Sequence, residues 1–261
     1  MSIAKPATPA REYISPSDLT FGFSTCHRCL WLKYWYDFGY KTDFPLLKTL
    51  STAQEESFRR APMPSLDASL PAGVVKQWGQ WVKSQYIIVN GEKSRWRLRG
   101  IYDLLGHYDD GTVGIIDCKV SDSERDNGDF YAPQLEAYAY CLENPLSGKV
   151  FPVSTMGLLI WKLGGAAQTR PNEFVTHTMG FGVHQVYVPV ERDPARLAPV
   201  RPLGDEHFRA LGEVGEALPR PRVVAAEQRA LGGRGVVAGI VPRHRGGGNC
   251  RRVASTDSST G

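Results

Sequence analysis

The chain has 261 residues, which is enough to bury one sizeable hydrophobic core with a small appendage. It contains no run of about 18 apolar residues and no signal-peptide pattern, so we expect a cytoplasmic protein that does not enter a membrane. Its formal net charge of +4 is too small to indicate nucleic-acid binding by itself, and five cysteines without a secretory context argue against a disulfide framework.

The amino-terminal part predicts a flexible lead followed by an aromatic helix. Residues 1–12 have the composition of a flexible segment, and residues 15–19 predict a helix start with a serine cap. Three aromatic residues then recur at helical spacing, namely Trp31, Tyr34 and Trp35. Residues in this pattern usually pack into the core, and a stacking surface for unpaired bases is the alternative.

The next part predicts two helices and a short strand. Residues 46–60 carry a stripe of apolar side chains and are followed by prolines, which predicts a helix. Residues 61–73 are rich in Pro, Ser and Ala and predict a loop. Residues 74–84 predict a short amphipathic helix with its two tryptophans on one side, and residues 86–89 predict a strand that leads into an Asn-Gly turn.

Two strands joined by a tight turn form the centre of the sequence. Residues 96–105 are rich in aromatic and branched side chains, residues 109–111 supply the turn sequence Asp-Asp-Gly, and residues 113–120 return as a second strand. A hairpin centred on the middle of this turn places Asp103 opposite Asp117. Cross-strand neighbours have Cβ atoms roughly 4.5–5.5 Å apart, so the two carboxylates are expected to lie close together.

The two aspartates predict a metal site. Carboxylates this close repel each other unless a cation lies between them, and Mg²⁺ takes one or two carboxylates while it keeps several waters. Lys119 shares the strand face of Asp117, whereas Cys118 lies on the other face. Lys119 would orient a metal-bound water or neutralise developing negative charge, which suits metal-assisted hydrolysis of a phosphodiester. A lone Asp-x-Lys on a strand is more often a solvated face.

A helix after the hairpin carries two further polar residues. Gln134 and Tyr138 are four residues apart and therefore face the same way, and Pro133 fits the first turn of this helix. Residues 156–163 predict a strand that completes a β-α-β crossover, and residues 183–190 alternate as a last strand.

The carboxyl-terminal segment differs in composition from the rest of the chain. Residues 196–261 contain eleven Arg, no Lys and six acidic residues, and we expect an Arg/Gly-rich, poorly ordered segment. Such a tail would bind phosphates non-specifically, with a contribution that falls steeply with salt. A shifted reading frame in GC-rich coding sequence is the alternative explanation of this composition.

Three motifs together resemble a known family. Gly100-x-x-Asp103, Asp117-x-Lys119 and Gln134-x-x-x-Tyr138 are similar to the motifs of the PD-(D/E)XK nuclease superfamily and of its RecB-like branch. That branch includes CRISPR-associated and phage-encoded exonucleases that carry an iron–sulfur cluster. The resemblance covers roughly residues 13–165. It implies an α/β, restriction-endonuclease-like fold with a mixed central sheet flanked by helices, in a nuclease domain that we place at residues 13–195.

The resemblance also implies roles for single residues. Asp103, Asp117, Lys119, Gln134 and Tyr138 take catalytic positions, with Asp103 and Asp117 as ligands of Mg²⁺ or Mn²⁺. RecB-like nucleases place a His or an acidic residue on the preceding helix, three residues before an apolar one. Glu55 matches that position as a third metal ligand, and Glu56 is the rival choice.

Three cysteines are candidates for an iron–sulfur or zinc site. Cys26 and Cys29 form a Cys-x-x-Cys pair, and Cys250 is the only cysteine after Cys141. The iron–sulfur branch usually takes one cysteine from the amino-terminal region and three from the carboxyl terminus, so the usual triplet is absent here. The alternative is a pair of small residues that pack a helix.

We therefore expect a Mg²⁺- or Mn²⁺-dependent deoxyribonuclease, an exonuclease that acts on DNA ends or single strands in repair or recombination. The alternatives are a non-catalytic DNA-binding or scaffold subunit with a nuclease-like fold, and a structure-specific endonuclease. Because the sequence has no Walker pattern, ATP hydrolysis would have to come from a partner protein, such as a helicase or a recombination or CRISPR protein.

Overall fold

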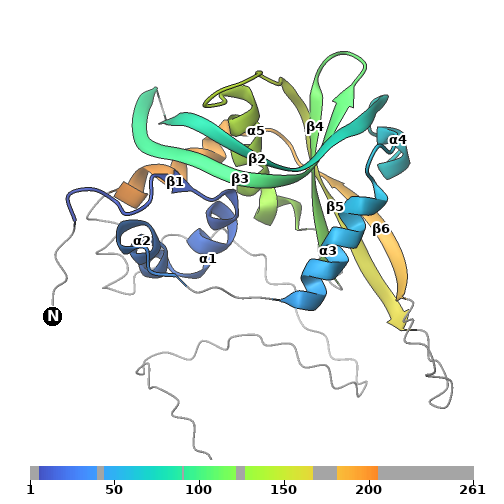
Figure 1. The fold of residues 1–261 in the computed structure, drawn as a ribbon, viewed down its shortest axis with the longest axis horizontal. Helices are drawn as coiled ribbons and strands as arrows, with labels where there is room; N and C mark the ends of the chain where they lie inside the picture. The colour runs from blue at the N-terminus through green and yellow to red at the C-terminus, as the bar shows by residue number, and fades with distance from the viewer. Residues whose placement is uncertain (1–5, 40–43, 90, 122–126, 167–180, 205–261) are drawn as a thin grey trace, which may run out of the picture. The chain divides into compact units, whose positions relative to one another are not determined.

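A computed structural model of the chain describes residues 6–39, 44–89, 91–121, 127–166 and 181–204 (Figure 1). Its helical elements are η1 (Asp18–Gly22, a π-helix), α1 (Phe23–Thr25), α2 (His27–Tyr36), α3 (Pro45–Ser57), α4 (Met63–Leu66), α5 (Gly128–Glu143) and η3 (Pro194–Gly204, a 3₁₀ helix). Its strands are β1 (Tyr13–Ile14), β2 (Gly73–Val89), β3 (Glu92–Tyr108), β4 (Val113–Ser121), β5 (Val153–Ala166) and β6 (Phe181–Pro189).

The strands form one mixed sheet. Its order is β1-β3-β4-β5-β6, and β2 pairs with β3 outside this path. The pairs β1–β3 and β4–β5 are parallel, and the other pairs are antiparallel. Because β4 and β5 are parallel neighbours joined through α5, the predicted β-α-β crossover is confirmed.

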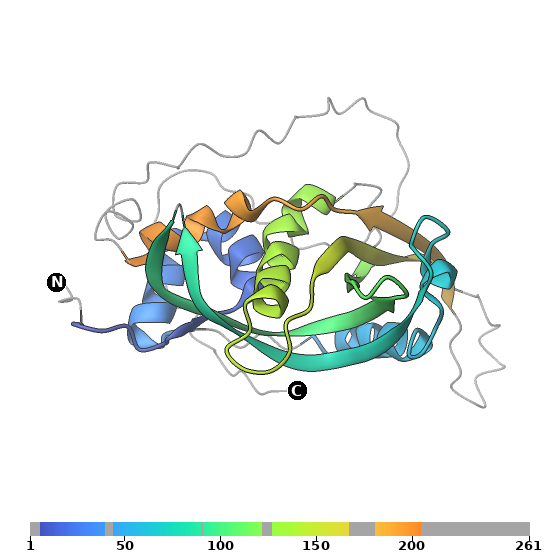
Figure 2. The same cartoon turned by 90° about the horizontal axis from the view of Figure 1, so that it is seen from above.

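Helices cover both faces of the sheet (Figures 1 and 2). On one face, Leu135 of α5 packs in a core that includes Leu105 and Leu158. On the other face, Met63 of α4 packs in a core that includes Leu104, the neighbour of Leu105 on the same strand. This arrangement confirms the expected α/β class with a mixed central sheet flanked by helices.

The prediction of a helix at residues 74–84 is wrong, because this segment belongs to the 17-residue strand β2. It pairs with β3 along almost its whole length, and the register shifts at three places. Trp78 and Trp81 are three residues apart, which suggested one helical face, but in the strand they lie on opposite faces. Trp78 packs against the core that contains Met63, whereas Trp81 is exposed. The loop expected at residues 61–73 contains the short helix α4.

The other elements agree with the sequence predictions, with one shift. The helix expected at residues 46–60 is α3, and the strands expected at 156–163 and 183–190 are β5 and β6. The helix α5 begins at Gly128, so Pro133 is its sixth residue and does not lie in its first turn as predicted. The earlier start extends the helix by more than one turn toward β4.

The amino-terminal aromatic residues are part of the core, which confirms the more common of the two interpretations. Trp31, Tyr34 and Trp35 are buried, and Tyr34 and Trp35 each make an edge-on contact with Trp96 of β3. The helical start near Ser17 is confirmed, although its side chain makes no capping hydrogen bond.

The helix η3 packs into the same core. Leu197, Val200 and Leu203 are buried there, and the backbone oxygen of Leu203 accepts a hydrogen bond of 3.0 Å from Trp35 Nε1. The domain that we expected to end near residue 195 therefore includes this helix. Residues 205–261, which hold most of the Arg/Gly-rich segment, lie outside the described residues. Among the described helices, none has the length and apolar character that a membrane crossing requires.

Candidate active site

The site is built at the open end of the β3–β4 hairpin. Leu104 pairs with Ile116 and Leu105 with Ile115, which is the register predicted from a turn centred on Asp110. In this register the next position sets Asp103 against Asp117, but the ladder ends one pair earlier. The two aspartates therefore lie where the strands begin to separate.

The carboxylate of Asp103 closes the end of this ladder. Its Oδ2 accepts a hydrogen bond of 2.7 Å from the backbone N–H of Cys118 on β4. A side chain thus replaces the backbone acceptor that a continuing ladder would supply. Burial, and after it the negative charge of Asp117, raise the pKa of Asp103 to about 8. Both effects oppose ionisation of this carboxyl, and a bound cation would relieve them.

Asp117 is held by two neighbours. Its side chain is buried, and its Oδ1 accepts a hydrogen bond of 2.7 Å from Gln134 Nε2 of α5. Its Oδ2 forms an ion pair with the ammonium group of Lys119. Burial lowers the pKa of Lys119, but the charges of Asp117 and Asp103 outweigh burial and raise it above the ordinary value. The two carboxylates thus favour the charged form of Lys119.

Tyr138 fixes α5 against the edge of β3. Its hydroxyl donates a hydrogen bond of 2.6 Å to the backbone oxygen of Ile101. Gly100 makes this approach possible, because a Cβ at this position would lie 2.9 Å from Tyr138 Cε1 and 2.8 Å from Pro16 Cδ. The glycine of the first motif is thus required by packing against the tyrosine of the third.

Comparisons with known proteins show the family of the chain. The model of the PD-(D/E)XK nuclease superfamily matches residues 34–235, a span that contains all three motifs. The chain belongs to the PD-(D/E)XK nuclease superfamily. No curated protein matches the chain. A solved structure titled "Crystal structure of SSO0001" is similar, with 14% identity, a TM-score of 0.39 and 77% of each chain covered.

In this member of the PD-(D/E)XK superfamily, the helix α3 brings one acidic residue toward the site. Gln54 Nε2 donates a hydrogen bond of 2.6 Å to the backbone oxygen of Leu159, which fixes α3 on the sheet. The next residue, Glu55, is half-buried, and its Oε2 lies near Gly79, the residue that faces Asp103 in the β2–β3 register. Burial raises the pKa of Glu55, Arg59 lowers it, and the charge of Asp117 raises it.

Glu56, the rival candidate, lies on the surface. Glu56 is exposed and forms an ion pair of 3.5 Å with Arg59. The structure thus places Glu55 on the side of the aspartates and Glu56 on the surface. Of the two, Glu55 is the one on the side of the aspartates, but as it lies here it does not form a three-ligand group with them, and its role as a third ligand stays a prediction.

PD-(D/E)XK nucleases generally use divalent metals such as Mg²⁺, and the residues present fit such an ion. Asp103 and Asp117 supply carboxylate oxygens, and Gln134 Oε1 is buried with no hydrogen-bond donor within the described residues. A metal-bound water would satisfy this oxygen. No group of three or more His, Cys, Asp or Glu in the described part of the chain could enclose a metal. Water and substrate oxygens would therefore complete the coordination, as is typical of Mg²⁺.

The amino-terminal cysteines lie at the start of α2. Cys26 Sγ accepts a hydrogen bond of 3.2 Å from the backbone N–H of Cys29 and thereby caps the helix. The third candidate, Cys250, lies outside the described residues. The described residues thus give Cys26 a structural role, and the iron–sulfur or zinc site remains a prediction.

Tyr131 is a residue of the site that was not predicted from the sequence. The ammonium nitrogen of Lys119 lies 4.7 Å from the centre of the Tyr131 ring, a cation–π contact that helps to hold the lysine in place. Tyr131 precedes Gln134 by three residues and Tyr138 by seven, so all three belong to one helical stripe. This spacing was visible in the sequence, but a helix predicted to start near Pro133 left Tyr131 outside it.

Proposed function

We propose that the chain is a Mg²⁺- or Mn²⁺-dependent deoxyribonuclease of the RecB-like branch. The observation that carries this proposal is the convergence of Asp103, Asp117 and Lys119 at the end of one hairpin. Asp103 is held by the backbone of the opposite strand of the hairpin, and Asp117 and Lys119 are held by Gln134 and Tyr131 of α5. Such a set of like charges in a buried place is costly to stability, and it is expected where a metal and a phosphate bind.

Each residue of the site has a distinct role in this proposal. Asp103 and Asp117 would hold the metal, which supplies an activated water and polarises a phosphoryl oxygen when bound. Gln134 fixes the rotamer of Asp117 through its hydrogen bond, and Tyr138 holds the helix that carries Gln134. Lys119 presents its ammonium group to the attacking water and to the charge that develops on the phosphate.

The resemblance supports finer features of the proposal. The Gln-x-x-x-Tyr motif of α5 is typical of RecB-like exonucleases, and we propose an exonuclease that acts on DNA ends or single strands in the cytoplasm. Roles in repair, recombination or a phage or CRISPR pathway, with a helicase or another protein as partner, belong to the same proposal.

End-labelled and circular DNA test this function directly. Linear single strands, linear duplexes and circular single strands are incubated with Mg²⁺, with Mn²⁺ or with EDTA. We expect degradation of linear DNA that requires a metal, and no degradation of the circles. Asp117→Asn should abolish cleavage, and Asp109→Asn, which changes an exposed turn aspartate, is the matched control.

The other outcomes separate the alternatives. Cleavage of circular DNA would indicate an endonuclease. A wild-type protein that binds DNA but cuts none of these substrates with either metal would be a non-catalytic DNA-binding subunit. Cleavage by Asp117→Asn at the wild-type rate would refute the assignment of the site.

A further inference from the structure

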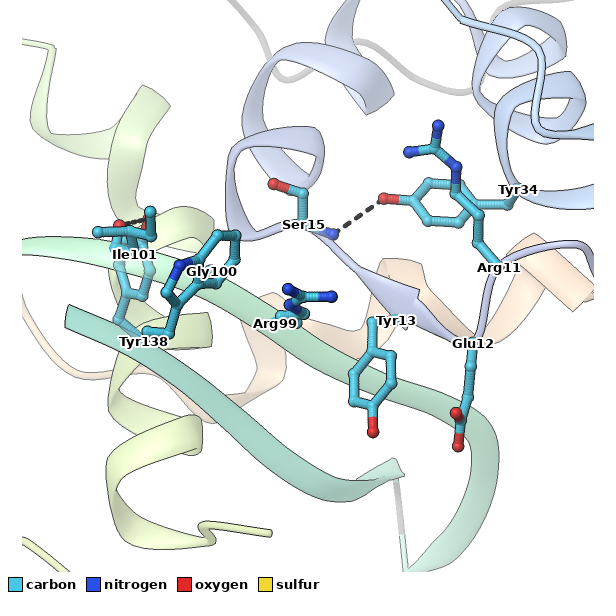
Figure 3. Close-up of a pocket in the computed structure, with 10 residues that line it drawn as sticks. Arg11, Glu12, Tyr13, Ser15, Tyr34, Arg99, Gly100, Ile101 and Tyr138 are labelled. Atoms are coloured by element: carbon cyan, nitrogen blue, oxygen red, sulfur yellow. Dashed lines mark hydrogen bonds between the residues drawn. The ribbon is translucent and has the colours of Figure 1, made fainter. Parts of the chain in front are cut away.

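A cavity of about 590 Å³ lies beside β3 and Tyr138 of α5 (Figure 3). Its volume lies within the roughly 300–1,000 Å³ that is typical of small-ligand sites. Residues of β2, β3 and α5 line it, together with residues around β1. Tyr138 is one of them, so the cavity shares a side chain with the third motif of the site.

The cavity lies along a part of β3 that has one open edge. On this edge β1 pairs with Arg97 and Leu98, and β4 pairs from Leu104 onward. Within the described residues, no strand pairs with positions 99–103 on this edge. Arg99 is the first residue of the opening and Asp103 is the last, so the cavity and the acidic site lie along one continuous strand segment.

An exposed tryptophan forms part of the cavity wall. Trp81 of β2 is 59% exposed, and it pairs with Ile101, which is 40% exposed. Ile101 is two residues before Asp103 on β3, a distance of about 7 Å along the strand. Large apolar side chains that lie exposed together and are rimmed by polar residues often mark a binding surface.

Arg99 supplies the charge that a nucleic acid requires. Its guanidinium lies over the Trp81 ring, 4.4 Å from the ring centre. Two nearby arginines are already paired, Arg11 with Asp37 at 2.6 Å and Arg97 with a glutamate at 2.5 Å. In the described part of the chain, Arg99 has no carboxylate at ion-pair distance, so its donors are open to a phosphate.

We infer that this cavity binds an unpaired nucleotide next to the scissile phosphate, with the base on Trp81 and Ile101 and a phosphate on Arg99. The inference rests on the proposed function and adds that the substrate is single-stranded at this position. A base inside a duplex has both faces covered by its neighbours and cannot lie on an indole ring. An unpaired base can stack on an aromatic ring or on a guanidinium plane, whatever its identity.

Binding without cleavage is the direct test. Labelled single-stranded and duplex DNA of one sequence are titrated with full-length protein in EDTA, and fluorescence anisotropy reports the dissociation constant. Trp81→Ala should weaken single-strand binding roughly 5- to 150-fold, as loss of one stacked base does, and Arg99→Ala should also weaken it. Duplex binding should not change. Trp81→Phe, which keeps an aromatic ring, should retain most of the affinity.

Two matched controls show whether the effect is local. Phe44→Ala removes an aromatic side chain that is 60% exposed and does not line the cavity, and Arg28→Ala removes an exposed arginine of α2. Both variants should bind single strands like the wild type. Circular dichroism of each variant confirms that the fold is retained.

An abasic scan locates the nucleotide. A single abasic position is moved along the labelled strand, and wild-type affinity should fall at one position. Trp81→Ala should lose this dependence, because the base and the indole act as one contact. Affinities of Trp81→Ala and Arg99→Ala equal to the wild type, or an equal loss on duplex DNA, would overturn the inference.

Cleavage assays with Mn²⁺ separate this inference from the proposed function. Wild-type protein that binds single strands through Trp81 but cuts nothing would refute the nuclease and leave the cavity assigned. Cleavage of single strands at the wild-type rate by Trp81→Ala and Arg99→Ala would refute the cavity and leave the nuclease. Wild-type protein that binds neither form of DNA would refute both.

Discussion

Two buried charge networks meet on α5, and they are built in opposite ways. Glu136 is 1% exposed and accepts hydrogen bonds from Arg192 and from the backbone N–H of Asp193. Arg192 also donates to Glu143 and to the backbone oxygen of Val153. The second network contains Asp103, Asp117 and Lys119, and it reaches α5 through Gln134, two residues before Glu136, which donates a hydrogen bond to Asp117.

The difference between the networks lies in how completely they are satisfied. Around Arg192 the carboxylates are bound by a guanidinium fork, and the hydrogen bonds raise the pKa of Arg192 above its ordinary value. Around Asp117 two carboxylates share one ammonium group, the pKa of Asp103 is raised, and the Gln134 amide oxygen has no described donor. The first arrangement is that of a structural clamp, and the second is the arrangement on which the proposed metal site rests.

The largest expected effect is the loss of activity in Asp117→Asn. Removing one carboxylate charge should lower the cleavage rate by at least about 10²–10³-fold, because the metal and the charge stabilisation depend on it. The free energy of unfolding in EDTA should change little, because the variant removes both the ion pair with Lys119 and the repulsion from Asp103, and Asp103 can ionise in place of Asp117 to pair with the lysine. Urea unfolding combined with the cleavage assay measures both. If Asp117→Asn were inactive because it is unfolded, the contrast between the two networks would be wrong.

The structural network should respond in the opposite way. Arg192→Ala leaves Glu136 buried without its cation, which should lower the free energy of unfolding by about 3 kcal/mol. Activity per folded molecule, measured well below the unfolding temperature, should stay close to the wild type. Arg196→Ala, which removes a more weakly paired neighbour, serves as the control and should change the unfolding free energy by less than about 1 kcal/mol.

An intermediate effect is expected from Gln134→Leu, which removes the hydrogen bond to Asp117 but leaves both aspartates. Groups that orient a metal ligand typically contribute about 10- to 100-fold, so the cleavage rate should fall by that factor. The dependence of the rate on Mn²⁺ concentration should shift to weaker binding. A change in DNA affinity with an unchanged metal dependence would show that Gln134 acts on the substrate instead.

The smallest effect is a gain in stability from Asp103→Asn. The pKa of Asp103 is raised in the folded state, so the unfolded chain loses this proton first as the pH rises. Stability of the metal-free protein should therefore fall between about pH 4 and pH 8. The amide carries no such charge, so Asp103→Asn should raise the unfolding free energy at pH 7 in EDTA by on the order of 1 kcal/mol.

The comparison of Asp103→Asn with the wild type is made by urea unfolding at pH 5 and pH 8. The increase in the free energy of unfolding of Asp103→Asn over the wild type should be larger at pH 8 than at pH 5. An equal gain at both pH values would mean that lost repulsion is not the cause. Addition of Mn²⁺ should stabilise the wild type more than the variant.

The hairpin and its motifs could be predicted because their geometry is local. A turn sequence sets the register of the strands that flank it, so the positions of Asp103 and Asp117 followed from counting outward from Asp110. Strand alternation separated Lys119 from Cys118, which is buried on the opposite face. Helical spacing put Gln134 and Tyr138 on one side of α5.

Other features could not be predicted, because residues far apart in the chain decide them. Residues 74–84 have a spacing of tryptophans that suits a helix, and only pairing with β3 along almost its full length makes them a strand. The resemblance favoured Glu55 over Glu56 without excluding either, and the anchoring of α3 through Gln54 decides which of them faces the aspartates.

The sequence by itself thus determined the chemistry of the site, since backbone periodicity and one turn fix which side chains share a face within a few residues. The tertiary structure alone decided what surrounds that site. The ion pair of Glu136 and Arg192 joins residues 56 positions apart. The cavity beside Arg99 exists because β1 and β4 leave part of one edge of β3 open. Such contacts depend on how whole elements pack, and no local pattern encodes them.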